Sequence, residues 1–449
     1  MPLVTANDLS QRIGVEPSQL RGWLRHRQRE GDPRLAEHQP GTRWRFAPDL
    51  ADALEYDYRV AHDLEVEAAP GPAGWWNWQA QVAGRPARET SGGGIRVLPL
   101  WEEYALYSDS RFVGSLTAGP AELLLAFTDG EPVVGRSAMQ LVLHVHDHLP
   151  SADRPTWDYE VENVASYYGG NTSDEFAALL SLALSVRLRS GGLIRSCIAG
   201  DDPAGRPMEL HHHPPTLVAP QRDPMLPYIA REISLGDAML LSTYPRIEGS
   251  DAVALVRAAQ AYADGLWLAD ADPRLAWIKL MSAVETAANH WKAASFDSPV
   301  EQLRRHRKRV YRALRDGDPA VLETVANDLA PTFHAERKFG QFLEEFDPGP
   351  PTVRPTMAQV DWTDLEDPLT VLYEYRSGEL HAGLPFPGPL CAPPAYAGDI
   401  PLERVGGLAV AFSGARWPAH RLPMYLHVFA HLVGGALREW WASLVRPPL

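Results

Sequence analysis

The chain has 449 residues, 45% of them apolar, which is enough for two or three domains with full-sized cores. Its net charge of −15 excludes a protein that coats nucleic acid over its whole surface, because phosphate binding depends on local cationic density. Two cysteines, Cys197 and Cys391, make no disulfide framework and indicate a reducing cytoplasm. The sequence has no run of 18 apolar residues and no secretory signal pattern, so we expect neither a membrane span nor export.

The first 60 residues are predicted to form a DNA-binding module. Thr5 is placed to cap a first helix, Gly14 marks a turn, and Pro17 opens a second helix. This spacing is that of a helix-turn-helix. Residues 1–46 contain eight Arg against five Asp or Glu, a local net charge of +3. The segment therefore provides a local basic patch for contact with DNA.

The outer face of the second helix and the segment after it carry the predicted DNA contacts. Residues 41–54 predict a short strand followed by a helix from Pro48, which resembles the wing and last helix of excisionase-like or MerR-like modules. The residues expected to contact DNA are Ser18, Gln19, Arg25, Arg43 and Arg45. The alternative is a small helical interaction module whose arginines face solvent.

The stretch 61–95 is rich in Pro, Gly and Ala and is predicted to be a linker, although its tryptophans should dock somewhere on the protein. Residues 96–249 follow as a mixed α/β middle domain. Short alternating runs predict strands there, and the apolar segment 175–189 predicts a helix buried all round. We therefore expect an α+β chain with a winged helix-turn-helix, a β-containing middle region and an all-α C-terminal bundle.

The middle region offers little chemistry. Three histidines, His144, His146 and His148, alternate on a predicted strand, and a zinc site there is conceivable. No Cys pair or His-Glu-x-x-His spacing supports it. The segment YYGGNTSDEF contains Gly169 and Gly170 but no lysine of a phosphate-binding loop, so it predicts a turn and a helix cap. We expect no metal and no cofactor.

The C-terminal region, residues 250–449, contains the candidate active site. In segment 273–291 apolar residues recur at spacings of three and four, with Glu285 at the edge of the stripe. A second helix is predicted to stop at Gly383, and it carries Arg376 and, after four further residues, His381. One of these groups can move protons while the other holds phosphorane charge, which suits RNA cleavage by the ribose 2′-hydroxyl without a metal.

The sequence Arg-Ser-x-x-x-His-x-Gly after an apolar and aromatic helical turn resembles the Arg-x4–6-His motif of HEPN domains, in particular the Apea-like HEPN group. The resemblance covers roughly residues 250 to 449. It implies an endoribonuclease that leaves 2′,3′-cyclic phosphate and 5′-hydroxyl ends. In this role His381 acts in acid–base catalysis, Arg376 stabilises the phosphorane, and Ser377 contacts the substrate or braces the pair. Bacterial relatives imply a setting in phage defence or a toxin–antitoxin system.

Further side chains are candidates around this motif. Glu285 is expected either to orient Arg376 or His381 or to be a plain boundary residue. His427 and His431 on the last helix are expected at the core edge. A basic run on one predicted helix, residues 301–315, is either a solvated face or a track for RNA phosphates. Its candidate RNA-binding residues are Arg304, Arg305, Arg307 and Lys308.

Two functions from different classes follow from these patterns. The first is a HEPN endoribonuclease fused to a DNA-binding module, and it is expected to be a homodimer because proton removal and leaving-group protonation are easiest with two histidines. The second is a DNA-binding transcriptional regulator or sensor whose HEPN domain is non-catalytic and serves for dimerisation or ligand binding.

Overall fold

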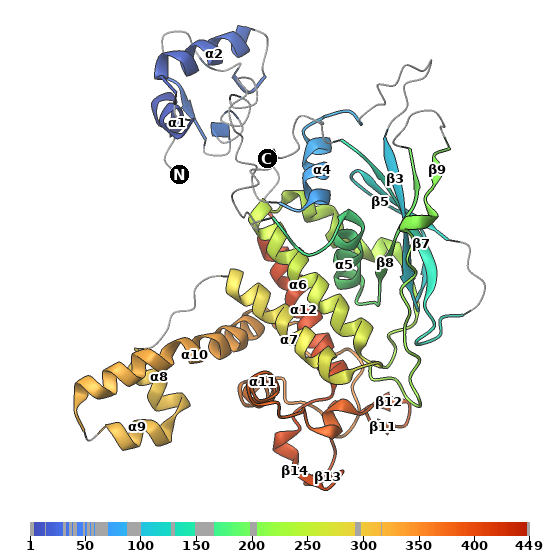
Figure 1. The fold of residues 1–449 in the computed structure, drawn as a ribbon, viewed down its shortest axis with the longest axis vertical. Coiled ribbons are helices and arrows are strands. Elements are labelled where there is room, and N and C mark those ends of the chain that lie inside the picture. The colour runs from blue at the N-terminus through green and yellow to red at the C-terminus, as the bar shows by residue number, and fades with distance from the viewer. Residues whose placement is uncertain are drawn as a thin grey trace. The chain divides into compact units, whose positions relative to one another are not determined.

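The computed structural model describes residues 4–13, 15–29, 33–35, 38, 43–47, 50–51, 54, 58, 71–87, 100–126, 131–148, 166–197, 204–291, 298–315 and 317–446. The chain divides into two compact units, residues 1–69 and residues 70–449. Helices and sheets are both present, so the predicted α+β class is confirmed at this level (Figure 1). Each unit is described by itself.

The smaller unit begins with two helices joined by a short turn. Its elements are β1 (Val4–Thr5), α1 (Ala6–Ile13), α2 (Pro17–Arg29), η1 (Pro33–Leu35) and β2 (Arg45–Phe46), with β1 antiparallel to β2. Thr5 Oγ1 accepts from the Asp8 amide at 3.2 Å, and the Asp8 carboxylate accepts from the Thr5 amide at 2.9 Å, which caps α1 reciprocally. Leu9, Leu20 and Leu24 are fully buried and hold the helices together. The predicted helix start at Pro48 lies outside the described residues.

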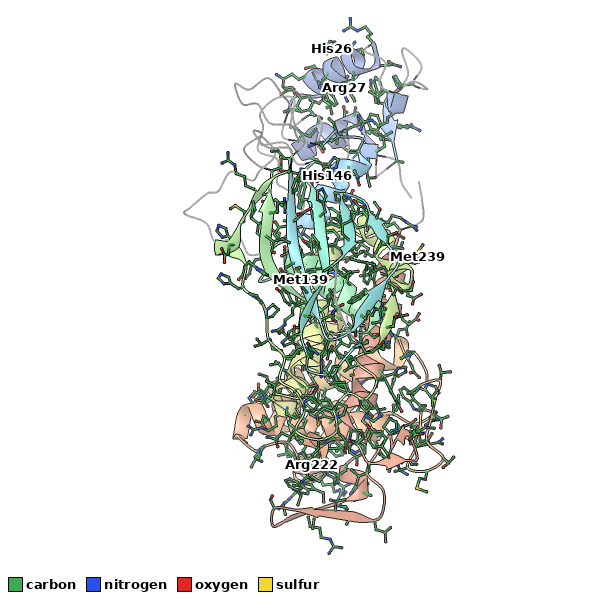
Figure 2. All side chains as sticks on the ribbon, turned by 90° about the vertical axis from the view of Figure 1, so that its right-hand side faces the viewer. His26, Arg27, Met139, His146, Arg222 and Met239 are labelled. Atoms are coloured by element: carbon green, nitrogen blue, oxygen red, sulfur yellow. The ribbon has the colours of Figure 1, made fainter. Side chains whose placement is uncertain are left out.

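The larger unit contains a six-stranded antiparallel sheet. In order across the sheet, its strands are β5 (Leu116–Ala118), β6 (Ala121–Leu125), β7 (Ala138–His146), β3 (Trp101–Ser108), β8 (Arg189–Ser196) and β9 (Arg206–Pro207). Helices cover one face, and Figure 2 shows the strands from the other side. A separate parallel pair joins β4 (Arg111–Val113) to β10 (Glu232–Ser234).

Two helices connect the sheet to the rest of the unit. Helix α5 (Thr172–Leu184) is buried nearly all round, as predicted, but it starts earlier than residue 175 and ends at Leu184 because Ser185 adopts a left-handed conformation with φ 53°. Residues 185–189, predicted to continue the helix, are therefore not helical. Helix α4 (Ala73–Val82) lies inside the stretch predicted to be a linker, and Trp75 and Trp78 are buried in the core. Residues 71–87 thus belong to the larger unit.

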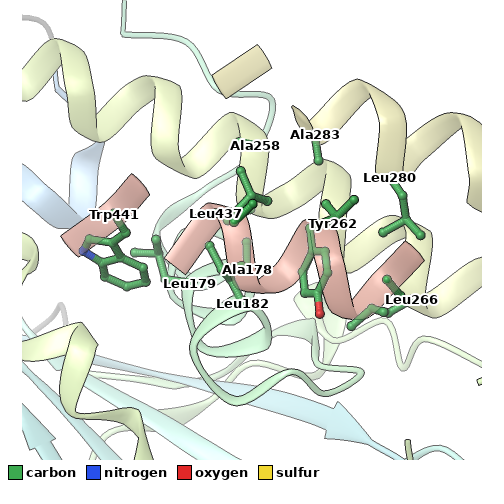
Figure 3. Packing of buried hydrophobic residues seen from close by; sticks show 14 of the residues in the cluster. Ala178, Leu179, Leu182, Ala258, Tyr262, Leu266, Leu280, Ala283, Leu437 and Trp441 are labelled. Carbon is green, nitrogen blue, oxygen red and sulfur yellow. The ribbon is translucent and has the colours of Figure 1, made fainter. Parts of the chain in front are cut away.

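Long helices form the rest of the core. They are α6 (Gly249–Leu268), α7 (Pro273–His290), α10 (Pro319–Glu345), α11 (Glu366–Ala382) and α12 (Leu426–Leu444). Side chains of α5, α6, α7 and α12 interlock, as Leu179, Tyr262, Leu280 and Leu437 do in Figure 3. One buried apolar cluster runs from Trp75 to Trp441. The predicted boundary between residues 249 and 250 therefore does not separate two cores.

The basic run at 301–315 forms two helices instead of the single predicted one. Helix α8 (Pro299–His306) and helix α9 (Lys308–Leu314) meet at Arg307, whose φ −134° and ψ 58° are not helical. They pack on the first half of α10 through a small separate core centred on Leu303 and Ala326. The break turns the two basic segments in different directions.

The prediction of an all-α region after residue 250 is wrong in part. Two β-hairpins, β11 (Tyr396–Ala397) with β12 (Ile400–Pro401) and β13 (Ala409–Phe412) with β14 (Ala415–Pro418), follow α11. Ser413 and Gly414 have φ 47° and φ 85°, the two positive angles that a tight hairpin turn of this kind needs. Over the parts of the chain that the structure describes, no helix combines the length and apolar character needed to cross a membrane.

Candidate active site and nucleic-acid surfaces

Helix α11 ends where the sequence predicts. Gly383 is left-handed with φ 63°, and the Leu384 amide donates to the Gly378 carbonyl at 3.1 Å, so the last turn is closed by backbone groups. His381 lies in this last turn and is exposed. The imidazole is therefore presented to solvent at the C-terminal end of the helix.

Arg376 lies earlier on α11 and faces helix α7. Its guanidinium forms an ion pair with Glu285, and its Cζ lies 5.6 Å from the centre of the Tyr373 ring. The Arg376 and Glu285 side chains are each only 16% exposed. Burial raises the pKa of Glu285, while Arg376 and a hydrogen bond from Tyr373 oppose that rise. Burial and the neighbouring Glu285 raise the pKa of Tyr373 to about 12, so the phenol stays protonated as a donor.

The side chains of Arg376 and His381 point in different directions, although the sequence predicts that they act together on one phosphorane. Five positions along an α-helix place a side chain about 140° further round the axis and about 7.5 Å along it. Within the described residues, the contacts of Arg376 are with Glu285 and Tyr373, and none joins it to His381. Arg376 Nε is buried and has no hydrogen-bond partner there. The two side chains are thus held apart within one subunit in this structure.

Sequence reasoning missed the side chains that hold this helix in place. Tyr373 lies one turn before Arg376, so its position as a shared neighbour follows from helical spacing and was there to be found. Arg421 is a distant anchor: its Nη1 lies 2.7 Å from Glu374 Oε2, and its carbonyl accepts from the Tyr375 hydroxyl at 2.8 Å. No local pattern signals that contact. Ser377 is half-buried on the same helix.

The loop after His381 is fixed to the helix. The Phe386 amide donates to Glu379 Oε2 at 3.0 Å, and the buried Phe386 ring stacks on Trp277 with centroids 5.9 Å apart. Leu380 and Leu384, by contrast, are 48% and 63% exposed. Two apolar side chains therefore flank the exposed histidine on a well-anchored surface.

The other histidines are placed differently. On α12, burial lowers the pKa of His427 to about 4, and His431 Nε2 lies 3.1 Å from the Gly349 carbonyl. Both are core-edge groups. His144 Nδ1 lies 3.3 Å from Glu103 Oε1 on the sheet. Where the structure describes the chain, no group of three or more His, Cys, Asp or Glu side chains is arranged to hold a metal ion.

The candidate RNA-binding residues lie at the junction of α8 and α9. Arg304 and Arg307 are exposed, and Arg304 pairs with Glu301. The side chains of Arg305 and Lys308 lie outside the described part. Exposed Arg309 and Arg312 extend the basic surface along α9. The small core of this helical pair leaves most of its charged side chains toward solvent.

The smaller unit presents its candidate DNA contacts on the surface. Ser18, Gln19 and Arg25 are exposed on α2, and Arg25 Nε donates to the Arg21 carbonyl at 3.0 Å. Arg43 and Arg45 are exposed on and beside β2. Buried residues alternate with these two arginines along the chain, as expected when one face of a strand packs on a core. All five residues are thus accessible.

Comparison with known proteins adds no neighbour: no family model, no curated protein and no solved structure matches the chain. The functional argument therefore depends on the residues themselves.

Proposed function

We propose that the chain is a metal-independent HEPN-type endoribonuclease in which His381 is the proton-transfer group. The observation that carries this proposal is an exposed imidazole at the end of a helix anchored by Glu285 and Arg421. Such an imidazole can take the proton of a ribose 2′-hydroxyl and return one to the leaving 5′-oxygen. The products are 2′,3′-cyclic phosphate and 5′-hydroxyl ends.

Arg376 contributes positive charge to the phosphorane, and Ser377 contacts the substrate or braces the pair. The 140° separation around α11 favours a composite site, in which two subunits related by a twofold axis supply their motif helices to one phosphate. The exposed Leu380 and Leu384 beside His381 give such an interface an apolar component. The active species is accordingly a homodimer.

Two basic surfaces of the chain bind the nucleic acids in this proposal. The α8 and α9 arginines form a phosphate track for RNA, and the smaller unit binds DNA as a winged helix-turn-helix through Gln19, Arg25 and Arg43. The local charge of residues 1–46 supports DNA binding, since the chain as a whole is acidic. Phage defence or a toxin–antitoxin system is the setting that fits a ribonuclease joined to such a module.

A second candidate is a DNA-binding regulator with a non-catalytic HEPN domain. The ion pair between Arg376 and Glu285 favours it, because an arginine neutralised by a half-buried carboxylate also serves as a structural tie. In this case the domain dimerises or binds a ligand and cuts nothing.

Incubation of the purified chain with total RNA in EDTA separates the two candidates. The nuclease leaves 2′,3′-cyclic phosphate ends, and His381→Ala removes them without changing the melting temperature. Cleavage that continues at the wild-type rate in His381→Ala sinks the assignment of that histidine. His290→Ala serves as the matched control, because His290 pairs with Asp251 on α6 away from the motif.

A further inference from the structure

The larger unit contains a pocket that the proposed ribonuclease chemistry does not use. It has a volume of about 430 Å³ and lies where the start of α5, the start of β8 and the middle of α6 meet. None of the residues lining it belongs to α11. Its size falls within the roughly 300–1,000 Å³ of typical small-molecule sites. One wall is the YYGGNTSDEF segment, whose glycines resemble no phosphate-binding loop.

This wall is held in place by its own contacts. Asn171 Oδ1 accepts from the Ser173 amide at 2.9 Å and from the Asp174 amide at 3.2 Å. Arg257 Nε of α6 donates to the Tyr167 carbonyl at 2.8 Å. A Cβ at Gly170 would lie 2.7 Å from Asp174 Cβ and 2.9 Å from Gln260 Nε2, so glycine leaves both side chains in their present positions. These contacts preorganise the wall of the pocket, which lowers the entropic cost of binding.

The charges on the two walls are not equivalent. On α6, Asp264 forms ion pairs with Arg189 and with Lys279, the latter at 2.9 Å, and the Arg189 guanidinium lies 5.0 Å from the centre of the Trp267 ring. Opposite, Asp174 Oδ2 accepts from the Asn171 amide at 3.0 Å, its one hydrogen bond to the described residues. No ion pair joins Asp174 to a cation in the described part of the chain. Its carboxylate is thus the acceptor left for a ligand.

The remaining lining decides the shape of that ligand. Ala177, Ala178 and Ala263 make a floor of small side chains, on which a flat ring can lie. Gln260 adds a carboxamide, which offers one acceptor and two donors beside the Asp174 carboxylate. A carboxylate accepts from an amino group of a base, and a carboxamide pairs with a base edge through two hydrogen bonds.

We propose that this pocket binds a nucleobase-bearing small molecule, a nucleoside or nucleotide, with the amino edge of the base on Asp174 and Gln260. The base lies on the alanine floor, and its sugar extends toward the open mouth. An aliphatic polyamine would use the carboxylate but would leave the carboxamide and the flat floor without a role. The inference stands independently of the ribonuclease proposal, since it uses no residue of α11.

Isothermal titration of the full-length chain with adenosine, guanosine, cytidine, their 5′-monophosphates and spermidine tests this assignment. At least one nucleoside or nucleotide should bind saturably, and Asp174→Asn and Gln260→Met should each weaken it by about tenfold or more, the effect of losing a paired polar contact. Asp328→Asn, an exposed aspartate on α10, should bind like the wild type. Melting curves of the unliganded variants show whether they remain folded.

Two results would overturn the proposal. One is the absence of saturable binding by every nucleoside and nucleotide up to millimolar concentration. The other is binding that Asp174→Asn and Gln260→Met leave unchanged while both proteins melt as the wild type does, which would place the ligand elsewhere. Spermidine binding that depends on Asp174 and not on Gln260, with no nucleoside bound, would identify an organic-cation site instead and reject the nucleobase.

Discussion

Arg376→Ala should destabilise the larger unit, and the reason lies in the carboxylate that the substitution leaves behind. Glu285 is 16% exposed, and burial already raises its pKa while Arg376 is present. Without the guanidinium, the ionised carboxylate has lost its only neighbouring cation among the contacts described for it. Breaking a fully buried pair costs about 3–5 kcal/mol, and partial exposure of this pair reduces the expected loss to about 2 kcal/mol. Loss of the contact with the Tyr373 ring adds up to about 1 kcal/mol.

Urea denaturation at pH 8 and pH 5 measures the effect and its cause together. Removing Arg376 raises the pKa of Glu285 further, so the carboxyl takes up a proton more readily as the pH falls. A raised pKa of an acid means stability that is present at low pH and lost as the pH rises. The loss of unfolding free energy in Arg376→Ala should therefore be larger at pH 8 than at pH 5. The m value, the slope of that free energy against urea concentration, should not change.

Two further variants make the reasoning refutable. The double variant Arg376→Met with Glu285→Gln removes both charges and should regain most of the lost stability. His381→Ala changes an exposed side chain and should stay within about 0.5 kcal/mol of the wild type. Equal stability of Arg376→Ala and wild type at pH 8 would show that the ion pair does not hold α11. We therefore expect little loss of folding for His381→Ala and a clear loss for Arg376→Ala.

Three other predictions concern separate parts of the chain. Burial raises the pKa of Glu175 from 4.5 to about 7. Protonation of Glu175 therefore stabilises the fold by up to about 3 kcal/mol below pH 4.5, and this stabilisation is lost as the pH rises through about 7. In Glu175→Gln the urea midpoint should depend less on pH between pH 5 and pH 8. Charge reversal at Arg25 and Arg43 should abolish salt-sensitive DNA binding and leave RNA cleavage intact, whereas undiminished binding after deletion of residues 1–60 would reject the placement. An equal mixture of wild-type and His381→Ala subunits, after exchange, should be less active than its wild-type subunits alone, whereas simple dilution would indicate independent sites.

The motif helix could be predicted from the sequence because its signals are local. The apolar spacing before Arg376 and the glycine at 383 fix where α11 runs and ends. The stripe on α7 places Glu285 at its edge, where the sequence allows either a partner for Arg376 or His381 or a plain boundary residue. The direction of Arg376 could not be predicted, since it depends on which face of α11 meets α7. The five-residue spacing alone already places Arg376 and His381 on different sides of α11. Tertiary packing decides that Arg376, and not His381, takes the inner face.

Elsewhere the sequence signal was weak or misleading. Strand β8 carries Gly191 and Gly192, which break the alternation that predicts a strand, and its pairing with β3 is interrupted at the same place. Helix α4 lies in a Pro- and Gly-rich stretch that does not predict a helix. The buried Glu175 carboxylate nevertheless accepts from the amides of Gly74 and Trp75 in its first turn, each at 2.8 Å. A carboxylate about a hundred residues later fixes its first turn. No local pattern contains that information.

The direction of Arg376 also limits what a ribonuclease mechanism in this chain can be. A guanidinium paired with Glu285 presents little net positive charge to a phosphate that approaches from the same side, because the carboxylate neutralises it. A phosphate arriving at His381 meets the other side of α11, where the exposed surface is apolar at Leu380 and Leu384. Catalysis thus requires either a second subunit that brings its own cations over that surface or a substrate that displaces Glu285 from Arg376. Glu285→Gln distinguishes the two routes: it should raise activity if the substrate phosphate has to displace Glu285 from Arg376, whereas unchanged or lower activity favours the second subunit.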